Sequence, residues 1–287
     1  MAVEIKRYDG AIREKRLAGM PGSNESTMNI IVCVKQVPDT TVVKIDPVKG
    51  TLIREGVPSI MNPDDKGGLE LALRLKDEFG ANVTVISMGP PQADVMLREA
   101  LAMGADRAIL LSDRKFAGAD TLATSYALSG LCRVLDYDLI IAGRQAIDGD
   151  TAQVGPELAE HLDLPQITYV AGAKLLDNGN LQVEKENEDG VQVLEVEGKC
   201  LLTVLASAFD ARYMSVSGIM EAYDKEVEVW SADKIDVEEG KLGLAGSPTK
   251  VFKSFPKAMK APGEVHEVTP EEAVELIVNQ LKVKHII

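Results

Sequence analysis

The residues best suited to chemistry lie in one stretch, residues 138–162, which reads DLIIAGRQAIDGDTAQVGPELAEHL. Its apolar run at 139–142 predicts a buried strand, and a polar turn follows at 144–150. Thr151 or Asp150 stands where a helix N-cap is expected, and the rest of the stretch has helical apolar spacing. A strand, a turn and a helix N-terminus present backbone N–H groups to an anion, so the stretch predicts a bound phosphate or nucleotide diphosphate.

Arg144 is the side chain of this turn that most clearly indicates an anion. It follows a buried strand and precedes a helix N-terminus, where a guanidinium group can bind phosphate through two hydrogen bonds; the alternative is an ordinary surface charge. The sequence lacks GxSxG, HExxH, P-loop and GxGxxG motifs, and its three cysteines and three histidines show no disulfide or metal-ligand spacing. The chain therefore resembles a holder of a cofactor that itself carries the chemistry.

The composition excludes several classes of protein. The chain has 287 residues, of which 45% are hydrophobic, enough for one large domain or two modest ones. A net charge of −14 and an aromatic content of 4% argue against nucleic acid as a partner. No apolar run reaches the ~18 residues of a membrane span, and scattered cysteines fit a reducing compartment. We therefore expect a cytoplasmic protein without a membrane span.

Strands and helices alternate in the first half of the chain, which predicts an α/β fold with a parallel sheet and right-handed crossovers. Ligands bind such sheets beyond the carboxyl ends of the strands. The predicted strands are 29–37, 82–88, 108–111 and 139–142. Asn62 as N-cap, Pro63 at the first helical position and acids at 64 and 65 predict a helix that runs to about Phe79. Further helices are predicted at about 93–103 and from 121 to near 135. The strand ends that would form the site are Val34–Asp39, Met88–Pro90, Ser112–Asp113 and Gly143–Asp150.

The pattern changes after Pro165. Four further strands joined by hairpin-type turns predict an antiparallel extension at one edge of the domain: 167–176, 181–186, 191–196 and 201–205. Regular pattern is sparse from Tyr223 to Glu267, as in a long arm that packs on another chain or in a disordered segment. Thr269 and Glu272 form a capping box before a terminal amphipathic helix.

These patterns divide the chain into three parts. Residues 1–27 differ from the rest and are interpreted as a leader or disordered extension; they contain no apolar signal region, so they are not expected to be a secretory signal. Residues 28–222 form the nucleotide-binding α/β domain, and residues 223–287 form a C-terminal arm with a helix.

Seven motifs stand in order along the chain: CVKQVPD at 33–39, MNPDD at 61–65, ISMGPP at 86–91, GAD at 104–106, AGRQAIDGDTAQVGPELAE at 142–160, RYMSVSGIMEAYDKEV at 212–227 and GLAGSPTKV at 243–251. Together they closely resemble the β (small) subunit of electron transfer flavoproteins. The resemblance runs from Met28 to the C-terminus. Cys200 departs from it, since the family's signature usually has proline there.

The resemblance implies a Rossmann-like, adenine nucleotide hydrolase-like domain that pairs with an α subunit whose own C-terminal domain binds FAD. In ordinary members the β subunit holds structural AMP and docks a dehydrogenase. The 142–160 motif, with GADTLATS at 118–125 and the C-terminal motifs, is similar to the electron-bifurcating group, whose β subunit holds a second FAD. That group passes electrons between NADH, ferredoxin and a flavin-dependent dehydrogenase. The chain would then be an electron carrier within an NAD- and ferredoxin-dependent oxidoreductase complex, and the AMP-binding form is the alternative.

The resemblance also implies which residues bind the cofactor. Those expected beside the adenine and ribose are Cys33, Val34, Lys35 and Asn62, with Met88 and Gly89 closing over the nucleotide. Asp120 and Thr121 would bond ribityl or phosphate groups. Those expected around the diphosphate and isoalloxazine are Gly143, Arg144, Gln145, Asp148, Gly149, Asp150, Thr151, Ala152 and Gln153.

Several of these residues also have a simpler interpretation. Lys35 could be a solvated charge at a strand end, and Cys33 a small core residue rather than a redox thiol. Asp120 and Thr151 could be plain N-caps, a role compatible with ligand binding. Two acids near a phosphate make sense if one caps the helix and the other meets a ribityl hydroxyl or a flavin edge.

The 212–227 motif matches the loop with which the family recognises its dehydrogenase. It places Tyr213, Val216, Ile219 and Met220 at the docking surface, with Val216 as the apolar anchor. The alternative for Val216 is a minor core contact. The negative net charge predicts partners with basic patches.

Overall fold

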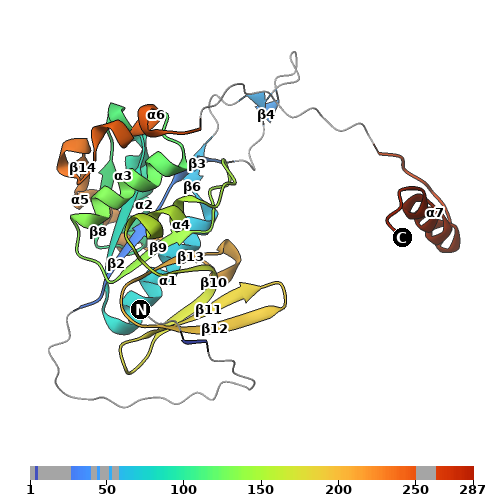
Figure 1. Ribbon diagram of the computed structural model, residues 1–287, viewed down its shortest axis with the longest axis horizontal. Helices are drawn as coiled ribbons and strands as arrows, with labels where there is room; N and C mark the ends of the chain where they lie inside the picture. Colours follow the sequence, from blue (N-terminus) through green and yellow to red (C-terminus); the bar gives the residue numbers. More distant parts are fainter. Residues whose placement is uncertain (1–3, 6–26, 40–43, 46–51, 54–57, 250–262) are drawn as a thin grey trace. The chain divides into compact units, whose positions relative to one another are not determined.

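The computed structural model describes residues 4–5, 27–39, 44–45, 52–53, 58–249 and 263–287 (Figure 1). The chain divides into two compact units, Met1–Val251 and Phe252–Ile287, each of which is described by itself. The predicted leader lies outside the described residues except for Glu4, Ile5 and Thr27.

One large sheet organises the first unit. Among the described residues it has ten strands in the order β1-β12-β11-β10-β13-β9-β2-β7-β8-β14. The seven strands from β10 to β14 in this order are parallel to one another, and β10 is antiparallel to β11 on its other side. The strands are β1 (Glu4–Ile5), β2 (Asn29–Cys33), β7 (Asn82–Met88), β8 (Arg107–Leu111), β9 (Leu139–Gly143), β10 (Gln166–Leu175), β11 (Leu181–Asn187), β12 (Gly190–Val196), β13 (Cys200–Val204) and β14 (Val227–Trp230).

Helices cover both faces of this sheet. α1 (Pro63–Phe79), α2 (Asp94–Met103) and α5 (Val216–Asp224) pack into one hydrophobic core, and α3 (Thr121–Arg133) and α4 (Val154–His161) pack into another. The remaining elements of this unit are β3 (Gln36–Pro38) paired with β6 (Ser59–Met61), β4 (Lys44–Ile45) paired with β5 (Leu52–Ile53), η1 (Pro91–Ala93), η2 (Arg114–Phe116), η3 (Ala206–Ala208), η4 (Ala232–Lys234), η5 (Glu239–Lys241) and α6 (Gly243–Gly246).

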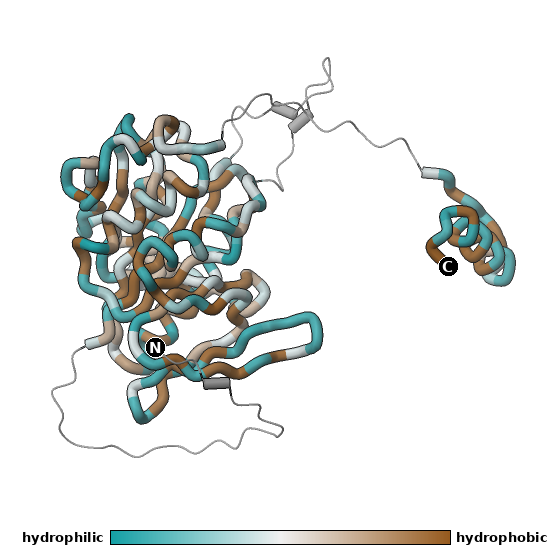
Figure 2. Tube along the Cα trace, viewed as in Figure 1, coloured by the Kyte–Doolittle hydropathy of each residue, from teal (hydrophilic) through white to brown (hydrophobic). Residues whose placement is uncertain are grey.

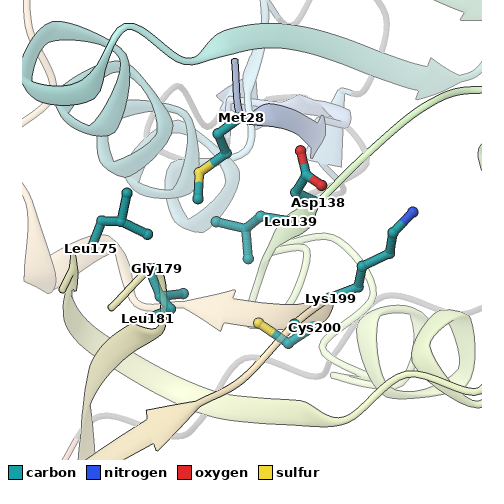
Figure 3. Close-up of a pocket in the computed structure, with 9 residues that line it drawn as sticks. Met28, Asp138, Leu139, Leu175, Gly179, Leu181, Lys199 and Cys200 are labelled. Carbon is teal, nitrogen blue, oxygen red and sulfur yellow. The ribbon is translucent and has the colours of Figure 1, made fainter. Parts of the chain in front are cut away.

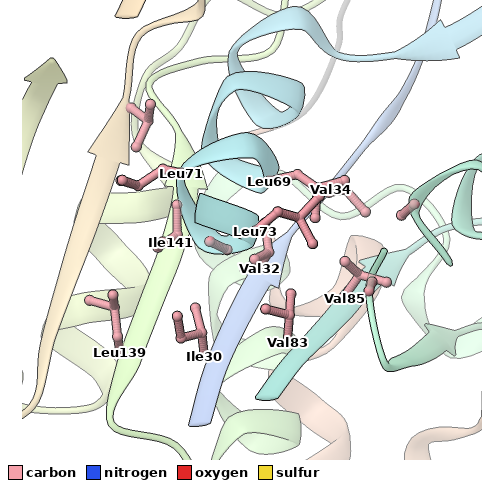
Figure 4. Packing of buried hydrophobic residues seen from close by; sticks show 14 of the residues in the cluster. Ile30, Val32, Val34, Leu69, Leu71, Leu73, Val83, Val85, Leu139 and Ile141 are labelled. Atoms are coloured by element: carbon pink, nitrogen blue, oxygen red, sulfur yellow. The ribbon is translucent and has the colours of Figure 1, made fainter. Parts of the chain in front are cut away.

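Successive residues of each central strand face the two cores alternately. In β2, Ile30 and Val32 belong to the core beside α1 (Figure 4). Ile31 and Cys33 belong to the core beside α3 and α4. Both faces are therefore buried, which explains the nearly continuous apolar runs in the sequence. Each buried aliphatic side chain contributes roughly 1.5–3 kcal/mol relative to an exposed one. Figure 2 shows hydrophobic residues concentrated in the sheet and a hydrophilic tip on the β11–β12 hairpin.

The predicted α/β fold with a parallel sheet and an antiparallel extension is confirmed, but two strands have a different place. β13 was expected in the antiparallel extension and instead lies parallel between β9 and β10. All of its residues are buried, as expected for a central parallel strand, but the preceding hairpin turns suggested an antiparallel neighbour. β14 pairs with β8 inside the region predicted to be sparse in regular structure. β14 has only four residues, too few to show a clear alternation of apolar and polar side chains in the sequence.

Of two helix N-termini predicted from capping residues, one is confirmed and one is displaced along the chain. The capping box is confirmed, because Thr269 and Glu272 bond each other's backbone N–H at the start of α7 (Pro270–Val283), the helix of the second unit. The helix in the candidate stretch begins at Val154, two residues after the expected start. Asp150 and Ala152 have φ values of 52° and 53°, which are incompatible with a helix, so Gln153 and not Thr151 is the N-cap residue.

Candidate functional site

A cleft of about 830 Å³ lies beyond the carboxyl ends of β2, β7 and β9, next to the N-termini of α3 and α4. This is the position expected for a ligand in a parallel sheet, and the volume falls within the usual range for small-molecule and cofactor pockets. The predicted cofactor-binding residues that line it are Cys33, Val34, Lys35, Met88, Asp120, Thr121, Gly143, Arg144, Gln145, Asp148, Gly149, Thr151, Ala152 and Gln153. Asn62, Gly89 and Asp150 lie outside this lining.

The polar turn after β9 is held in shape by its own acids. Asp148 forms an ion pair with Lys35, whose Nζ is 2.7 Å from Oδ1, so the turn is joined to the end of β2. Asp150 accepts a hydrogen bond from Gln145 Nε2 at 3.1 Å and does not cap α4. Positive φ costs about 1–2 kcal/mol at Ala152 and less at Asp150, because aspartate adopts this region more readily. Such strained positions are typical of ligand-binding turns.

Arg144 lies at one edge of the cleft. Its Nε is 3.4 Å from Asp64 Oδ2, and its guanidinium carbon is 5.8 Å from the centre of the Tyr169 ring. Its backbone N–H donates to Val204 on β13. Part of its charge is therefore balanced by a carboxylate, and the predicted role in binding phosphate stays a prediction.

The first turn of α1 contributes two acids that the sequence identified only as helix-start residues. Asp65 accepts hydrogen bonds from the backbone N–H of Lys35 at 2.8 Å and of Gly143 at 3.1 Å. Asp64 accepts from the N–H of Ala206 at 2.9 Å. The first turn of α1 therefore joins the ends of β2, β9 and β13. The position of both acids beside Asn62 in the MNPDD motif is the signal that could have identified them.

Asn62 was predicted as an N-cap near the adenine, and the structure gives it a different contact. It is the N-cap residue of α1, but its side chain makes no capping bond. The fully buried side chain donates to the carbonyl of Gln145 at 2.8 Å and accepts from the N–H of Ile147 at 3.1 Å. It supports the polar turn from outside the cleft.

Burial controls the acid–base behaviour of two residues that line the cleft. It raises the pKa of Asp65 to about 7, and the neighbouring Asp64 acts in the same direction, against hydrogen bonds from Asn62, Lys35 and Gly143. Burial also raises the pKa of the Cys33 thiol well above its usual value. A thiol that stays protonated is a poor nucleophile, which agrees with the interpretation of Cys33 as a small core residue.

Asp120 caps α3 and also holds a distant segment. One oxygen accepts from Ala123 N–H at 3.0 Å, and the other accepts from the N–H and hydroxyl of Thr249 at 3.0 and 2.8 Å. Burial alone would raise the pKa of Asp120, but these hydrogen bonds lower it. Thr121 donates to Gln153 at 3.1 Å. Thr249 lines the cleft too, and the sequence indicated it only as part of the GLAGSPTKV motif.

The predicted docking residues lie on and before α5. Tyr213 is 98% exposed and Val216 is 78% exposed, and Ile219 and Met220 are also exposed. Gly218 faces α2, where an added Cβ would lie 2.3 Å from the carbonyl oxygen of Ala102. The helix therefore packs through its glycine and leaves its larger apolar side chains outward, so Val216 is not a core contact.

A second cavity, of about 340 Å³, lies beside the amino ends of β9 and β13 (Figure 3). The polar side chains in its lining are engaged elsewhere: Asp138 accepts from the N–H of Asn29 at 2.8 Å, and Lys199 Nζ lies 4.7 Å from the centre of the Tyr137 ring. The predicted cofactor-binding residues are not part of this lining.

Among the described residues, no group of three or more histidine, cysteine, aspartate or glutamate side chains is placed to hold a metal ion. In the part of the chain that the structure describes, no helix is both long and apolar enough to cross a membrane.

The chain is similar to known proteins over most of its length. Residues 49–235 match the family described as electron transfer flavoprotein domain. The chain is 60% identical, over 91% of its length and 100% of the relative, to the electron transfer flavoprotein subunit beta of Clostridium acetobutylicum. It is 54% identical, over 91% of its length and 100% of the relative, to subunit CarD of the caffeyl-CoA reductase-Etf complex of Acetobacterium woodii. It is 48% identical, again over 91% and 100%, to the acryloyl-CoA reductase electron transfer subunit gamma of Anaerotignum propionicum. The chain therefore belongs to the electron transfer flavoprotein family, as a β subunit.

Proposed function

We propose that this β subunit belongs to the electron-bifurcating group and binds FAD in the cleft beyond β2, β7 and β9. The observation that carries the proposal is the extent of the cleft, which reaches from Lys35 through the turn 143–153 to the start of α3 and has a volume of about 830 Å³. A cleft of this volume, lined by apolar side chains as well as by the polar turn and the start of α3, suits a dinucleotide better than a mononucleotide. The names of two relatives, a caffeyl-CoA reductase-Etf complex subunit and an acryloyl-CoA reductase electron transfer subunit, also support it.

The residues present fit such a cofactor. The backbone N–H groups at the start of α3 and in the strained turn would meet the diphosphate, helped by the positive ends of the helix dipoles. Arg144 and Lys35 would add the only local positive side-chain charge among the residues that line the described cleft. Thr121, Asp148 and Gln153 carry oxygen atoms for hydroxyl groups of the ligand. When bound, FAD would supply hydride acceptance from NADH and single-electron transfer, and the chain would orient it and exclude water.

We also propose two partner surfaces. Tyr213, Val216, Ile219 and Met220 would contact a flavin-dependent dehydrogenase, because they are exposed apolar side chains on a well-anchored segment. The anchor is Arg212, whose Nε lies 2.9 Å from the buried carboxylate of Glu70. The arm that follows the first unit and ends in α7 would pack on an α subunit, and ferredoxin would accept electrons from the assembled complex. Exposed Val274 and Ile277 on α7 support this role for the arm.

The test is a count of cofactors. The full chain is purified with its α subunit, and FAD and AMP are measured per heterodimer. Two FAD molecules are expected. One FAD together with one AMP would refute the bifurcating assignment and leave the AMP-binding form, which docks a dehydrogenase without its own redox chemistry.

A variant then tests the predicted phosphate position. Arg144→Ala is expected to weaken FAD binding in the cleft roughly tenfold or more, because a hydrogen bond between charged groups contributes about 1.5–3 kcal/mol. Arg74 provides a matched control, since it also pairs with a carboxylate, Glu70, at 3.0 Å and lies 5.0 Å from an aromatic ring, Phe209. It lies outside the cleft, so Arg74→Ala should keep full occupancy. Equal occupancy in both variants would contradict the placement of the phosphate beside Arg144.

A further inference from the structure

We propose that Asp65 is a positioning residue for the nucleotide: its carboxylate holds the ends of β2 and β9 at the spacing on which the ligand lies. This proposal rests on the proposed nucleotide-binding function of the cleft. Lys35 and Gly143 line the cleft, and Asp65 binds the backbone N–H of both. Asp65 is only 8% exposed, so water cannot easily replace either bond.

Both carboxylate oxygens of Asp65 are in use. Oδ2 accepts from Lys35 N–H at 2.8 Å, and Oδ1 accepts from Gly143 N–H at 3.1 Å. The first turn of α1 also reaches Lys35 through Asn62, whose N–H donates to the Lys35 carbonyl at 2.9 Å. The end of β2 is therefore joined to α1 by two bonds. At the end of β9 the N–H of Gly143 donates to Asp65, and two residues later the N–H of Gln145 donates to Asp64 Oδ2 at 3.3 Å. Because the two N–H groups meet different oxygens, an amide in place of the carboxylate would turn its NH2 group, a donor, toward one of them.

The ionised form of Asp65 is the one that supplies two equivalent acceptors. Burial raises the pKa of Asp65 to about 7, so the ionised fraction changes across the neutral range. The titratable and charged groups around it are Asp64 on α1, Cys33 and Lys35 at the end of β2, and Arg144 and Asp148 on the polar turn. Lys35 is paired with Asp148 and Arg144 with Asp64, so neither cation is paired with Asp65 in these contacts.

Positioning and folding have opposite pH signatures at this residue. The folded chain keeps the proton of Asp65 up to about pH 7, whereas the unfolded chain loses it near pH 3.9, so the Asp65 contribution to folding stability falls as pH rises between these values. Nucleotide affinity should instead rise with pH through 7, because ionisation completes the two hydrogen bonds. A residue with a merely structural role would show only the first trend.

The experiment is a calorimetric titration of the nucleotide-free full chain with FAD, whose diphosphate keeps its charge from pH 6 to pH 8. At pH 6 about one tenth of Asp65 is ionised, so wild-type affinity is expected to be roughly tenfold weaker than at pH 8. Asp65→Asn is expected to bind roughly tenfold more weakly than wild type at pH 8 and to lose the pH dependence. Asp138→Asn is the matched control, because Asp138 joins the opposite ends of the same two strands through Asn29 N–H at 2.8 Å. It should bind FAD with wild-type affinity.

The outcomes separate this inference from the proposed function. Wild-type binding that is independent of pH, or Asp65→Asn binding as tight as wild type, would overturn the positioning role and leave the function intact. A wild-type chain that binds neither FAD nor AMP would overturn the function itself. If Asp65→Asn fails to fold, the wild-type pH profile decides the question alone.

Discussion

Gly143→Ala introduces one methyl group at the point where β9 meets the first turn of α1. An added Cβ would lie 2.2 Å from Asp65 Oδ1, 2.6 Å from Asp65 N and 2.8 Å from the carbonyl carbon of Asp64. Ordinary contact begins near 3.4 Å, so the backbones of the strand and the helix must separate by about 0.8 Å, and the Asp65 carboxylate must move by about 1.2 Å. Two of the three atoms belong to the backbone, and a rotamer change cannot relieve the overlap.

The magnitude follows from the contacts that would change. Inserting a methyl group into a well-packed region costs about 1–3 kcal/mol. Separation also weakens the bond from Gly143 N–H to the buried carboxylate of Asp65, which is worth about 1.5–3 kcal/mol. We expect the free energy of unfolding to fall by roughly 3–5 kcal/mol, a large part of the 5–15 kcal/mol typical of a folded domain.

Gly149→Ala is the matched control within the same turn. Nothing lies within 4 Å of a Cβ added at Gly149, so we expect a change of roughly 0.5 kcal/mol or less. Urea unfolding followed by far-ultraviolet circular dichroism measures both variants, and FAD titration shows whether the cleft changes with stability. If the unfolding free energies of the two glycine variants differ by less than about 1 kcal/mol, the close approach of β9 and α1 does not limit stability, and the prediction is wrong.

Three further predictions concern other parts of the chain. Ala152→Gly should leave the chain as stable or up to about 1 kcal/mol more stable in urea unfolding, because glycine adopts a φ of 53° without strain; a loss of stability would show that Ala152 makes a needed contact. Glu70→Gln should cost about 1.5–3 kcal/mol at pH 7, since Glu70 is buried and binds Arg212. Burial alone would raise the pKa of Glu70, but hydrogen bonds from Arg212 and Arg74 lower it, so this stability exists above the unfolded pKa of about 4.3 and disappears as pH falls through the lower folded value. A difference between wild type and variant that persists at pH 2 would contradict this linkage. Val216→Asp should leave the unfolding free energy within about 0.5 kcal/mol of wild type but weaken dehydrogenase binding in a pull-down or titration, and a stability loss would show that Val216 is a packing residue instead.

The sequence by itself determined the elements whose signals are local. Buried parallel strands appeared as continuous apolar runs, as in residues 29–33 and 139–143, because both faces of each strand are covered. Helix starts at Pro63 and Pro270 were visible because capping and first-turn residues are neighbours in the chain. The candidate stretch after β9 was visible for the same reason, and the order of motifs identified the family.

Only the tertiary structure decided which distant groups complete the cleft. Asp65 meets Gly143 across 78 positions of the sequence and Asp64 meets Ala206 across 142, so no local spacing records either contact. β13 lies parallel between β9 and β10, and all of its residues are buried. Its place in the sheet depends on these neighbours and not on its own residue pattern. Local propensity specifies an element, but long-range packing decides what that element holds in place, and here the first turn of α1 holds the ends of three strands.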